Sequence, residues 1–395
     1  MTLTTVSPAT LLTDEMLQRF DERAPVYDRE NRFFDEDFEE LLKSGYVSAA
    51  LPEKYGGVGL NLAEVMKLQQ KLAYYAPATA IAVNMHFYWT GLAADMVRMG
   101  DESVRWILEE ASRGHIFAAG HGESGNDVPI LLSTTRAERV DGGWKFYGHK
   151  IFGSLSPVWT YLGLHGMDTS DPADPKVVHA FLARDAEDFR IVETWDTLGM
   201  RATQSHDTIL EGAFVPDNRI ALVCPPGEAG AGLFHIALDA WALLGFAAVY
   251  AGIAQRAFDM TIESAKKRTS IALTRPMAYH PELQHEVARM RLALESLIAH
   301  LNSVCNDWVQ GWDDGGAMLV KIIAAKYMVV TQAWQVVDTA LELSGGSGIF
   351  KRSRMEQLFR DARLGRIHPA NSMLTHEFLA KASLGISGDE SPRWG

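Results

Sequence analysis

The chain has 395 residues, of which 47% are hydrophobic and 22% are charged, so it is long enough to bury a substantial core. Its formal net charge is −13 and its basic runs are short, which argues against a groove for nucleic acid. The two cysteines, Cys224 and Cys305, lie far apart without a CxxC spacing, so the sequence predicts neither a disulfide framework nor a metal site and fits a reducing cytoplasm.

The N-terminal segment MTLTTVSPATLLTDEM has no basic stretch followed by an apolar one, so no signal peptide is expected. Residues 236–255 are long and apolar enough to be weighed as a membrane span. Asp239 lies near the start of that segment, however, and its small residues suit close packing between helices. We therefore predict a buried helix, no membrane partner and a cytoplasmic location.

Apolar spacing divides the chain into three parts. Residues 1–114 repeat apolar side chains at helical intervals and predict an N-terminal α-helical domain. Residues 115–226 alternate in the manner of strands, with a hairpin signal at Asp141-Gly142-Gly143, and predict a central β-domain. Residues 227–395 return to helical spacing, with long segments near 233–268, 280–311 and 315–344. This order predicts an α+β fold with segregated layers.

Seven short motifs follow one another along the chain: LPEKYGGVGL (51–60), GESGND (122–127), GHKIFGS (148–154), LGMRATQS (198–205), GIAQRAFDMTIESAKKR (252–268), LSGGSGIF (343–350) and RDARLGRI (360–367). Together they make the chain resemble the acyl-CoA dehydrogenase superfamily over nearly its full length. The resemblance implies an N-terminal helical domain, a central β-barrel or sandwich domain and a C-terminal four-helix bundle. It also implies a flavin, FAD with FMN as the alternative, in a homotetramer or homodimer.

The resemblance implies flavin contacts in the first half of the chain. Phe152 matches an aromatic residue that stacks on the isoalloxazine ring, and Ser154 matches a hydroxyl near flavin N5. Asn126 stands where the family commonly has a serine that binds the pyrophosphate. Three glycines leave backbone N–H groups accessible to a flavin or phosphate: Gly120, Gly122 and Gly125. The alternative is that Phe152 is a core residue and Ser154 an ordinary strand residue.

The second half of the chain supplies the implied contacts to the flavin diphosphate. Arg268 matches an arginine that reaches the diphosphate of a neighbouring subunit, for which a guanidinium offers a bidentate fork. Gly345 and Gly346 match a glycine-rich turn along the same group, and Asn371 aligns with a threonine of that site. Taken singly, Arg268 could instead compensate a helix dipole, and the glycines could end a helix.

The catalytic carboxylate of the family is missing. The resemblance gives this carboxylate two alternative positions. The usual one, after the RDARLGRI motif, is occupied by Pro369, and the one on the long helix expected over residues 233–268 is occupied by Ala242. An arginine that grips CoA in the family falls at Leu243. Asp239 lies three residues from Ala242, about 300° around a helix, so it is expected on a neighbouring row.

Two histidines then become candidates. His368 resembles a histidine of the flavin monooxygenases of this fold, such as the dibenzothiophene enzymes, where it could hydrogen-bond a C4a-hydroperoxide and move protons. His86, on the central apolar helix, is a second candidate pocket residue. The alternatives are a hydrogen-bonded core position for His86 and a loop position for His368.

Three functions stay open from the sequence. The first is an FAD-dependent oxidoreductase that transfers hydride from an acyl-CoA-like small molecule to flavin N5, with Asp239 or His368 as base and an electron-transfer partner. The second is a two-component monooxygenase supplied with reduced flavin by a separate flavin reductase. The third is a scaffold of the same fold without catalysis. The catalytic candidates are His368, Ser154, Asp239 and His86.

Overall fold

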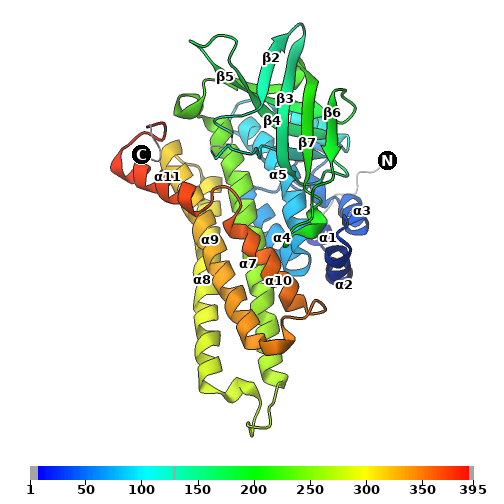
Figure 1. The fold of residues 1–395 in the computed structure, drawn as a ribbon, viewed down its shortest axis with the longest axis vertical. Helices are drawn as coiled ribbons and strands as arrows, with labels where there is room; N and C mark the ends of the chain where they lie inside the picture. Colours follow the sequence, from blue (N-terminus) through cyan, green and yellow to red (C-terminus); the bar gives the residue numbers. More distant parts are fainter. Residues whose placement is uncertain (1–7, 128–129, 391–395) are drawn as a thin grey trace.

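A computed structural model describes residues 8–127 and 130–390 of the chain (Figure 1). The N-terminal part is helical: α1 Pro8–Leu11, α2 Asp14–Glu30, α3 Asp35–Ser44, η1 Tyr46–Ser48, η2 Glu53–Tyr55, α4 Leu62–Tyr75, α5 Pro77–Arg98 and α6 Arg105–Ser112. Local chemistry fixes the start of α4, where Asn61 and Glu64 form a reciprocal capping box. Pro77 opens α5 at a position where a missing N–H costs no helical bond.

The middle of the chain folds into strands β1 Phe117–Gly120, β2 Arg136–Val140, β3 Gly143–Gly153, β4 Tyr161–Asp168, β5 Lys176–Ala183, β6 Phe189–Val192, β7 His206–Pro216 and β8 Ile220–Cys224. They form one sheet in the order β6-β7-β3-β2-β4-β5-β8, with β1 added in parallel beside β4. The predicted hairpin joins β2 to β3, and Gly142 there has a φ of 74°. Such a turn favours glycine because a Cβ is strained in this region.

The last part contains the long helices α7 Leu233–Lys267, α8 Pro281–Gln310 and α9 Gly315–Ser344, followed by α10 Arg354–Arg363 and α11 Ser372–Leu384. The sheet lies at one end of the molecule, and α7, α8 and α9 extend away from it side by side (Figure 1). Short turns η3 Arg201–Thr203, η4 Asp217–Arg219, η5 Gly227–Gly230, η6 Met277–Tyr279, η7 Gly345–Ser347 and η8 Leu364–Arg366 complete the connections.

Helix α7 is the centre of the core and packs against α4, α5, α8 and α9. Glycines make its closest contacts possible, since a Cβ on Gly91 would lie 2.2 Å from the Trp241 ring and one on Gly245 would lie 2.2 Å from Asn84. Within residues 8–127 and 130–390, two helices are long and apolar enough to cross a membrane, Leu233–Lys267 and Gly315–Ser347. In α7, 83% of the apolar window is buried inside the molecule, as expected for a core helix.

The helical, β, helical order of the sequence prediction is confirmed. The predicted domain limits at residues 114/115 and 226/227 stay predictions; they fall between α6 and β1 and between β8 and α7. The three long helices begin and end within about two residues of the segments expected from apolar spacing.

Candidate active site

The end of β3 presents an exposed aromatic ring beside a row of hydroxyls. Phe152 has a φ of 62° and is 57% exposed, so its ring is not part of the core of the single chain. The Trp195 ring meets it edge-on at 6.0 Å between centroids. Behind it, Ser154 Oγ and Ser205 Oγ lie 2.7 Å apart, and Ser205 Oγ lies 2.7 Å from Thr203 Oγ1. A flat ring with a polar edge fits this surface, which is what a flavin offers.

The segment opposite Phe152, residues 195–205, is held in place by α10. The backbone N–H of Met200 donates to Asp361 Oδ1 over 2.6 Å, and Arg360 Nη1 donates to the carbonyl of Leu198 over 2.9 Å. A Cβ on Gly199 would lie 2.6 Å from the Arg360 carbonyl carbon, so only glycine allows this approach. The LGMRATQS and RDARLGRI motifs are therefore in direct contact.

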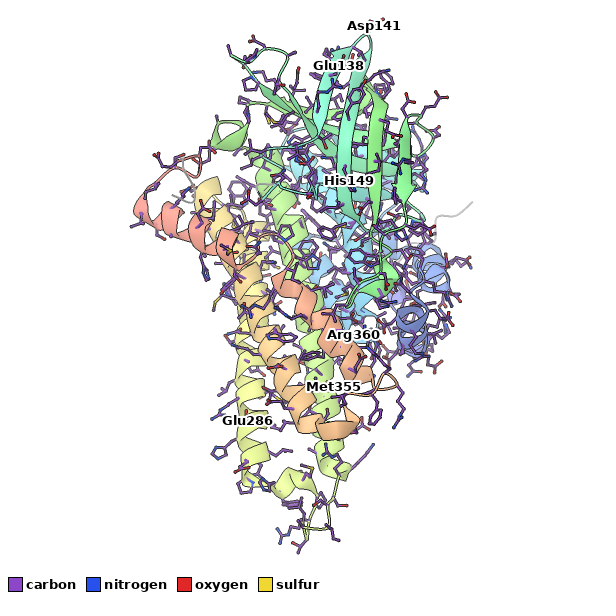
Figure 2. All side chains as sticks on the ribbon, in the orientation of Figure 1. Glu138, Asp141, His149, Glu286, Met355 and Arg360 are labelled. Carbon is purple, nitrogen blue, oxygen red and sulfur yellow. The ribbon has the colours of Figure 1, made fainter. Side chains whose placement is uncertain are left out.

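Arg360 also ties this pair to the N-terminal helices. Its guanidinium donates to both carboxylate oxygens of Asp28 on α2, over 2.9 and 2.5 Å, and to both oxygens of Glu356. Figure 2 labels Arg360 on α10, below the strands. The neighbouring Asp361 is buried, and that burial raises its pKa to about 7. The buried ion pair fixes the position of the loop relative to α2 and α10.

The GESGND segment lies next to the KIFGS segment. The N–H of Ile151 donates to the carbonyl of Gly122 over 2.9 Å, and a Cβ on Gly122 would lie 2.7 Å from the Ile151 carbonyl. Asn126 Nδ2 donates to Glu123 Oε2 and to the Leu132 carbonyl, so its amide is tied into its own loop. The remaining predicted glycines differ: Gly120 packs within β1 against Leu162, and Gly125 has a φ of 77° with open space around it.

Arg268 and the glycine-rich turn after α9 meet in the structure. Arg268 Nη1 donates to the carbonyls of Leu343 and Ser344 over 2.8 and 3.0 Å, at the C-terminal end of α9. A Cβ on Gly345 would lie 3.4 Å from Arg268 Nη2, while Gly346 has open space around it. The predicted pairing of this arginine with the glycines is thus present, although the diphosphate role of both stays a prediction. A helix-capping role for Arg268 operates in the single chain.

His368 lies half-buried in the segment after α10. Its ring stacks on Phe246 at 4.8 Å between centroids with an interplanar angle of 19°, and Nε2 is buried without a hydrogen-bond partner among the described residues. The ammonium of Lys326 donates to the carbonyls of His368 and Ala370 over 2.7 and 2.9 Å. Burial, and then the Lys326 charge, lower the pKa of His368 to about 3. The imidazole is therefore neutral at physiological pH.

Both positions that the resemblance gives to a catalytic glutamate are apolar here: Ala242 is 4% exposed, and Pro369 follows His368. Leu243, at the position that the resemblance gives to the CoA arginine, is 5% exposed. Asp239 is the nearby carboxyl on α7, and burial raises its pKa to about 7. Burial, and then the Asp239 charge, raise the pKa of the Tyr88 phenol on α5. A carboxyl with such a pKa is a candidate base near neutral pH.

Two other predicted residues have structural partners of their own. His86 is 2% exposed on α5, its Nδ1 accepts from the N–H of Phe117 over 3.1 Å, and burial lowers its pKa to about 4. Asn371 caps α11 by accepting from the N–H groups of Met373 and Leu374. These contacts match the alternative of a core position for His86. The catalytic role of His86 and the flavin role of Asn371 stay predictions.

The sequence analysis missed a cluster of four buried histidines: His121, His165, His179 and His235. Adjacent rings lie 5.1 to 5.7 Å apart between centroids, and burial is the main cause that lowers the pKa of each ring. One signal was present in the sequence, because two of these histidines interrupt otherwise apolar strands, LGLHG and KVVHAFL. A histidine buried in an apolar strand either has a hydrogen-bond partner in the core or belongs to a functional site.

Comparison with known proteins places these motifs in a family context. The family model for the N-terminal domain of acyl-CoA dehydrogenases matches residues 11–106, and the model for their C-terminal domain matches residues 244–373. YdbM of Bacillus subtilis, provisionally named an acyl-CoA dehydrogenase, is 26% identical over 371 residues, which cover 92% of this chain and 93% of that protein. The amino sugar nitrososynthase DnmZ of Streptomyces peucetius is 26% identical over 387 residues, covering 94% and 92%.

Solved structures show the same fold. KijD3 in complex with FMN and a dTDP-amino sugar superposes with a TM-score of 0.81 at 23% identity, covering 96% of this chain and 93% of that one. Methanesulfinate monooxygenase MsuC of Pseudomonas fluorescens superposes with a TM-score of 0.81 at 19% identity, covering 97% of this chain and 100% of that one. Butyryl-CoA dehydrogenase of Megasphaera elsdenii superposes with a TM-score of 0.81 at 20% identity, covering 94% of this chain and 99% of that one. The predicted acyl-CoA dehydrogenase-like α+β fold is therefore confirmed.

Proposed function

The chain belongs to the acyl-CoA dehydrogenase family, whose relatives here are flavin-dependent enzymes, and from that premise we propose that it is a flavin-dependent monooxygenase. Its substrate would be a small molecule, and reduced flavin would come from a separate reductase. The observation that carries this proposal is the absence of a carboxylate at both family positions, combined with the neutral His368, whose buried Nε2 has no partner among the described residues.

The residues around Phe152 fit a flavin. The exposed Phe152 ring would lie against the isoalloxazine, and the hydroxyls of Ser154 and Ser205 would face its polar edge. Bound flavin would supply two-electron chemistry, either accepting a hydride or, when reduced, activating oxygen. FAD is favoured because Arg268, which lies beside Gly345, has further guanidinium N–H groups that could hold its diphosphate. FMN is the alternative, supported by the KijD3 complex.

The contribution of His368 follows from its environment. A neutral imidazole can donate from one ring nitrogen and accept at the other, and here Nε2 is the atom left without a partner. The stacking on Phe246 and the Lys326 contacts to the backbone hold the ring in one orientation. We assign His368 the role of a neutral hydrogen-bond partner that orients the reacting oxygen through Nε2. The nitrososynthase relatives favour a nitrogen atom of the small substrate as the oxidised centre.

One observation favours a second candidate, hydride transfer from an acyl-CoA-like substrate to flavin N5. Asp239 lies on the helix from which some family members supply their base, and its pKa is raised to about 7. A carboxyl with this pKa is half ionised at neutral pH and can accept a proton. The apolar Leu243 in place of an arginine weakens this candidate, because the CoA phosphate would lose an ionic contact.

One experiment separates the two candidates. The enzyme-bound flavin is reduced without oxygen and then mixed with oxygen in a stopped-flow spectrometer. The monooxygenase predicts that the oxidised flavin returns slowly through a distinct transient spectrum, and that His368→Ala abolishes the transient. His376→Ala, an exposed histidine on α11, is the matched control and should keep it. Anaerobic bleaching of the flavin by an acyl-CoA, lost in Asp239→Asn, would instead establish the dehydrogenase. Failure to bind FAD or FMN at all would leave the scaffold as the answer.

We further propose that the active unit is a homotetramer or homodimer. Arg268 uses one guanidinium nitrogen for the α9 carbonyls, so the others can reach a flavin held mainly by a second copy. Arg268→Ala should weaken flavin retention more than it weakens folding. Light scattering that gives a monomer with tightly bound flavin would contradict this arrangement.

A further inference from the structure

Three side chains that are distant in the sequence converge at one edge of the β-domain. His179 lies in β5, Cys224 is the last residue of β8, and His235 lies in the first turn of α7. Strands β5 and β8 are antiparallel neighbours in which Val177 is paired with Cys224. Since residues 177 and 179 point to the same face of β5, Cys224 and His179 share that face. The start of α7 brings His235 against them.

The geometry of these side chains suits a metal ion. His179 Nε2 and His235 Nε2 lie 3.3 Å apart, and one ligand atom from each of the three residues lies within 4.8 Å of the others. Two imidazole nitrogens bound tetrahedrally to one zinc ion are separated by about 3.4 Å, from Zn–N distances of about 2.0–2.1 Å. The nitrogens are therefore already at ligand spacing, and only the sulfur has to approach.

The environment leaves these ligands available. All three residues are buried, and burial lowers the pKa of His235 to about 4 and that of His179 well below its usual value. Both imidazoles are thus neutral, as a metal ligand must be. Nδ1 of each ring makes no hydrogen bond among the described residues, although the Ile130 carbonyl lies close enough to act on His179. A carbonyl on the far side of the ring favours the tautomer that leaves the Nε2 lone pair free.

Cys224 would supply a thiolate as the third ligand. Burial raises the pKa of its thiol, so the free chain carries a proton there that a metal ion would displace. The chain after β8 folds back over the sulfur, and a Cβ on Gly230 would lie 3.1 Å from Cys224 Sγ. The absence of a Cβ at Gly230 therefore leaves space beside the sulfur.

We propose that His179, Cys224 and His235 bind a zinc-type divalent cation, with water as the fourth ligand. The two imidazoles and one thiolate are the donor set that zinc and cobalt prefer over calcium or magnesium. Cys224 and His235 flank the loop that leads from the β-domain into the helical bundle, so the ion ties β8, β5 and the start of α7 together.

The test measures metal in the full chain, freed of any histidine tag. After dialysis against Zn²⁺ and then metal-free buffer, wild type should retain about one zinc per chain. Cys224→Ala and His235→Asn should each retain less than about one tenth of that amount. Cys305→Ala is the matched control, because Cys305 is also buried and unpaired, and it should bind as wild type does.

A second measurement keeps the proposal testable if a variant fails to fold. Co²⁺ added to wild type should produce an intense tetrahedral visible spectrum and a thiolate-to-cobalt band in the near ultraviolet, and both should survive in Cys305→Ala. Wild type that retains no zinc and gives no thiolate band would overturn the proposal. The 3.3 Å contact would then be a direct hydrogen bond between two neutral imidazoles. Equal metal in wild type and in a folded Cys224→Ala would overturn it as well.

Discussion

Arg360 offers the sharpest test of how the loop of residues 195–205 is held, because it joins that loop to α2 and α10. Its guanidinium makes four contacts to Asp28 and Glu356 and a fifth to the Leu198 carbonyl. The side chains of Arg360 and Asp28 are 9% and 8% exposed, so solvent screens this pair little. Arg360→Met keeps most of the apolar stem, removes every donor and leaves the Asp28 carboxylate buried without this cation.

The expected loss follows from these contacts. Breaking a buried ion pair by removing one partner costs about 3–5 kcal/mol, so Arg360→Met should lower the free energy of unfolding by about 4 kcal/mol. Combining it with Asp28→Asn should cost about 2 kcal/mol less than the sum of the two single changes, because the stranded carboxylate is then neutral. The loop at Leu198 also loses its anchor, so we expect weaker flavin binding in Arg360→Met.

Urea denaturation followed by far-ultraviolet circular dichroism measures these differences, and flavin fluorescence measures binding. Arg289→Met is the matched control, since the exposed Arg289 side chain pairs with Glu286. Figure 2 labels Glu286 on α8, far from the strands. It should change stability by less than about 0.5 kcal/mol. A loss below about 1 kcal/mol for Arg360→Met, or a coupling near zero with Asp28→Asn, would refute the reasoning.

Three further predictions concern single side chains. Phe152→Ala should weaken flavin binding about tenfold in a fluorescence titration while Phe214→Ala, on β7, leaves it unchanged; equal effects would count against the stacking role. Asp239 has a folded pKa of about 7, above its usual 3.8, so wild-type stability falls as pH rises from about 4 to 7. Asp239→Asn should therefore match wild type near pH 4 and exceed it by on the order of 2 kcal/mol at pH 8 in urea denaturation, and an equal difference at both pH values would contradict this. The pKa of Lys326 is about 7 in the folded chain, below its usual 10.5, so the stability of the wild type should rise between pH 7 and pH 10.5. Lys326→Met should remove that rise. Parallel pH profiles of the urea midpoint in wild type and Lys326→Met would contradict this prediction.

The helices could be predicted from the sequence because their signals are local. Apolar residues recur every three or four positions, and Asn61 with Glu64 marks the start of α4 by contacts within one turn. The strands were also visible, but their order was not. The parallel pairing of β4 with β1 and β2 joins strands that are not consecutive along the chain, and no pattern within a strand specifies such partners.

The candidate site was predictable only where a motif carried it. The sequence identified Phe152, Ser154 and Arg268 by resemblance, yet their surroundings depend on contacts such as the Met200 N–H to Asp361, which spans 161 positions. The pKa values of His368 and Asp239 arise from burial, which spacing cannot reveal. The histidine cluster escaped notice because His179 and His235 are 56 positions apart.

The length and position of α7 have a consequence for synthesis on the ribosome. Its 35 residues span about 50 Å and are apolar nearly all round. Two of its packing partners, α4 and α5, precede it in the chain, whereas α9 is complete only after roughly 80 more residues. At about 5–20 residues per second, the face of α7 that packs on α9 stays uncovered for roughly 4–16 seconds. Chaperone supply during that interval, rather than the stability of the finished fold, should limit the yield of soluble protein in a fast-translating host.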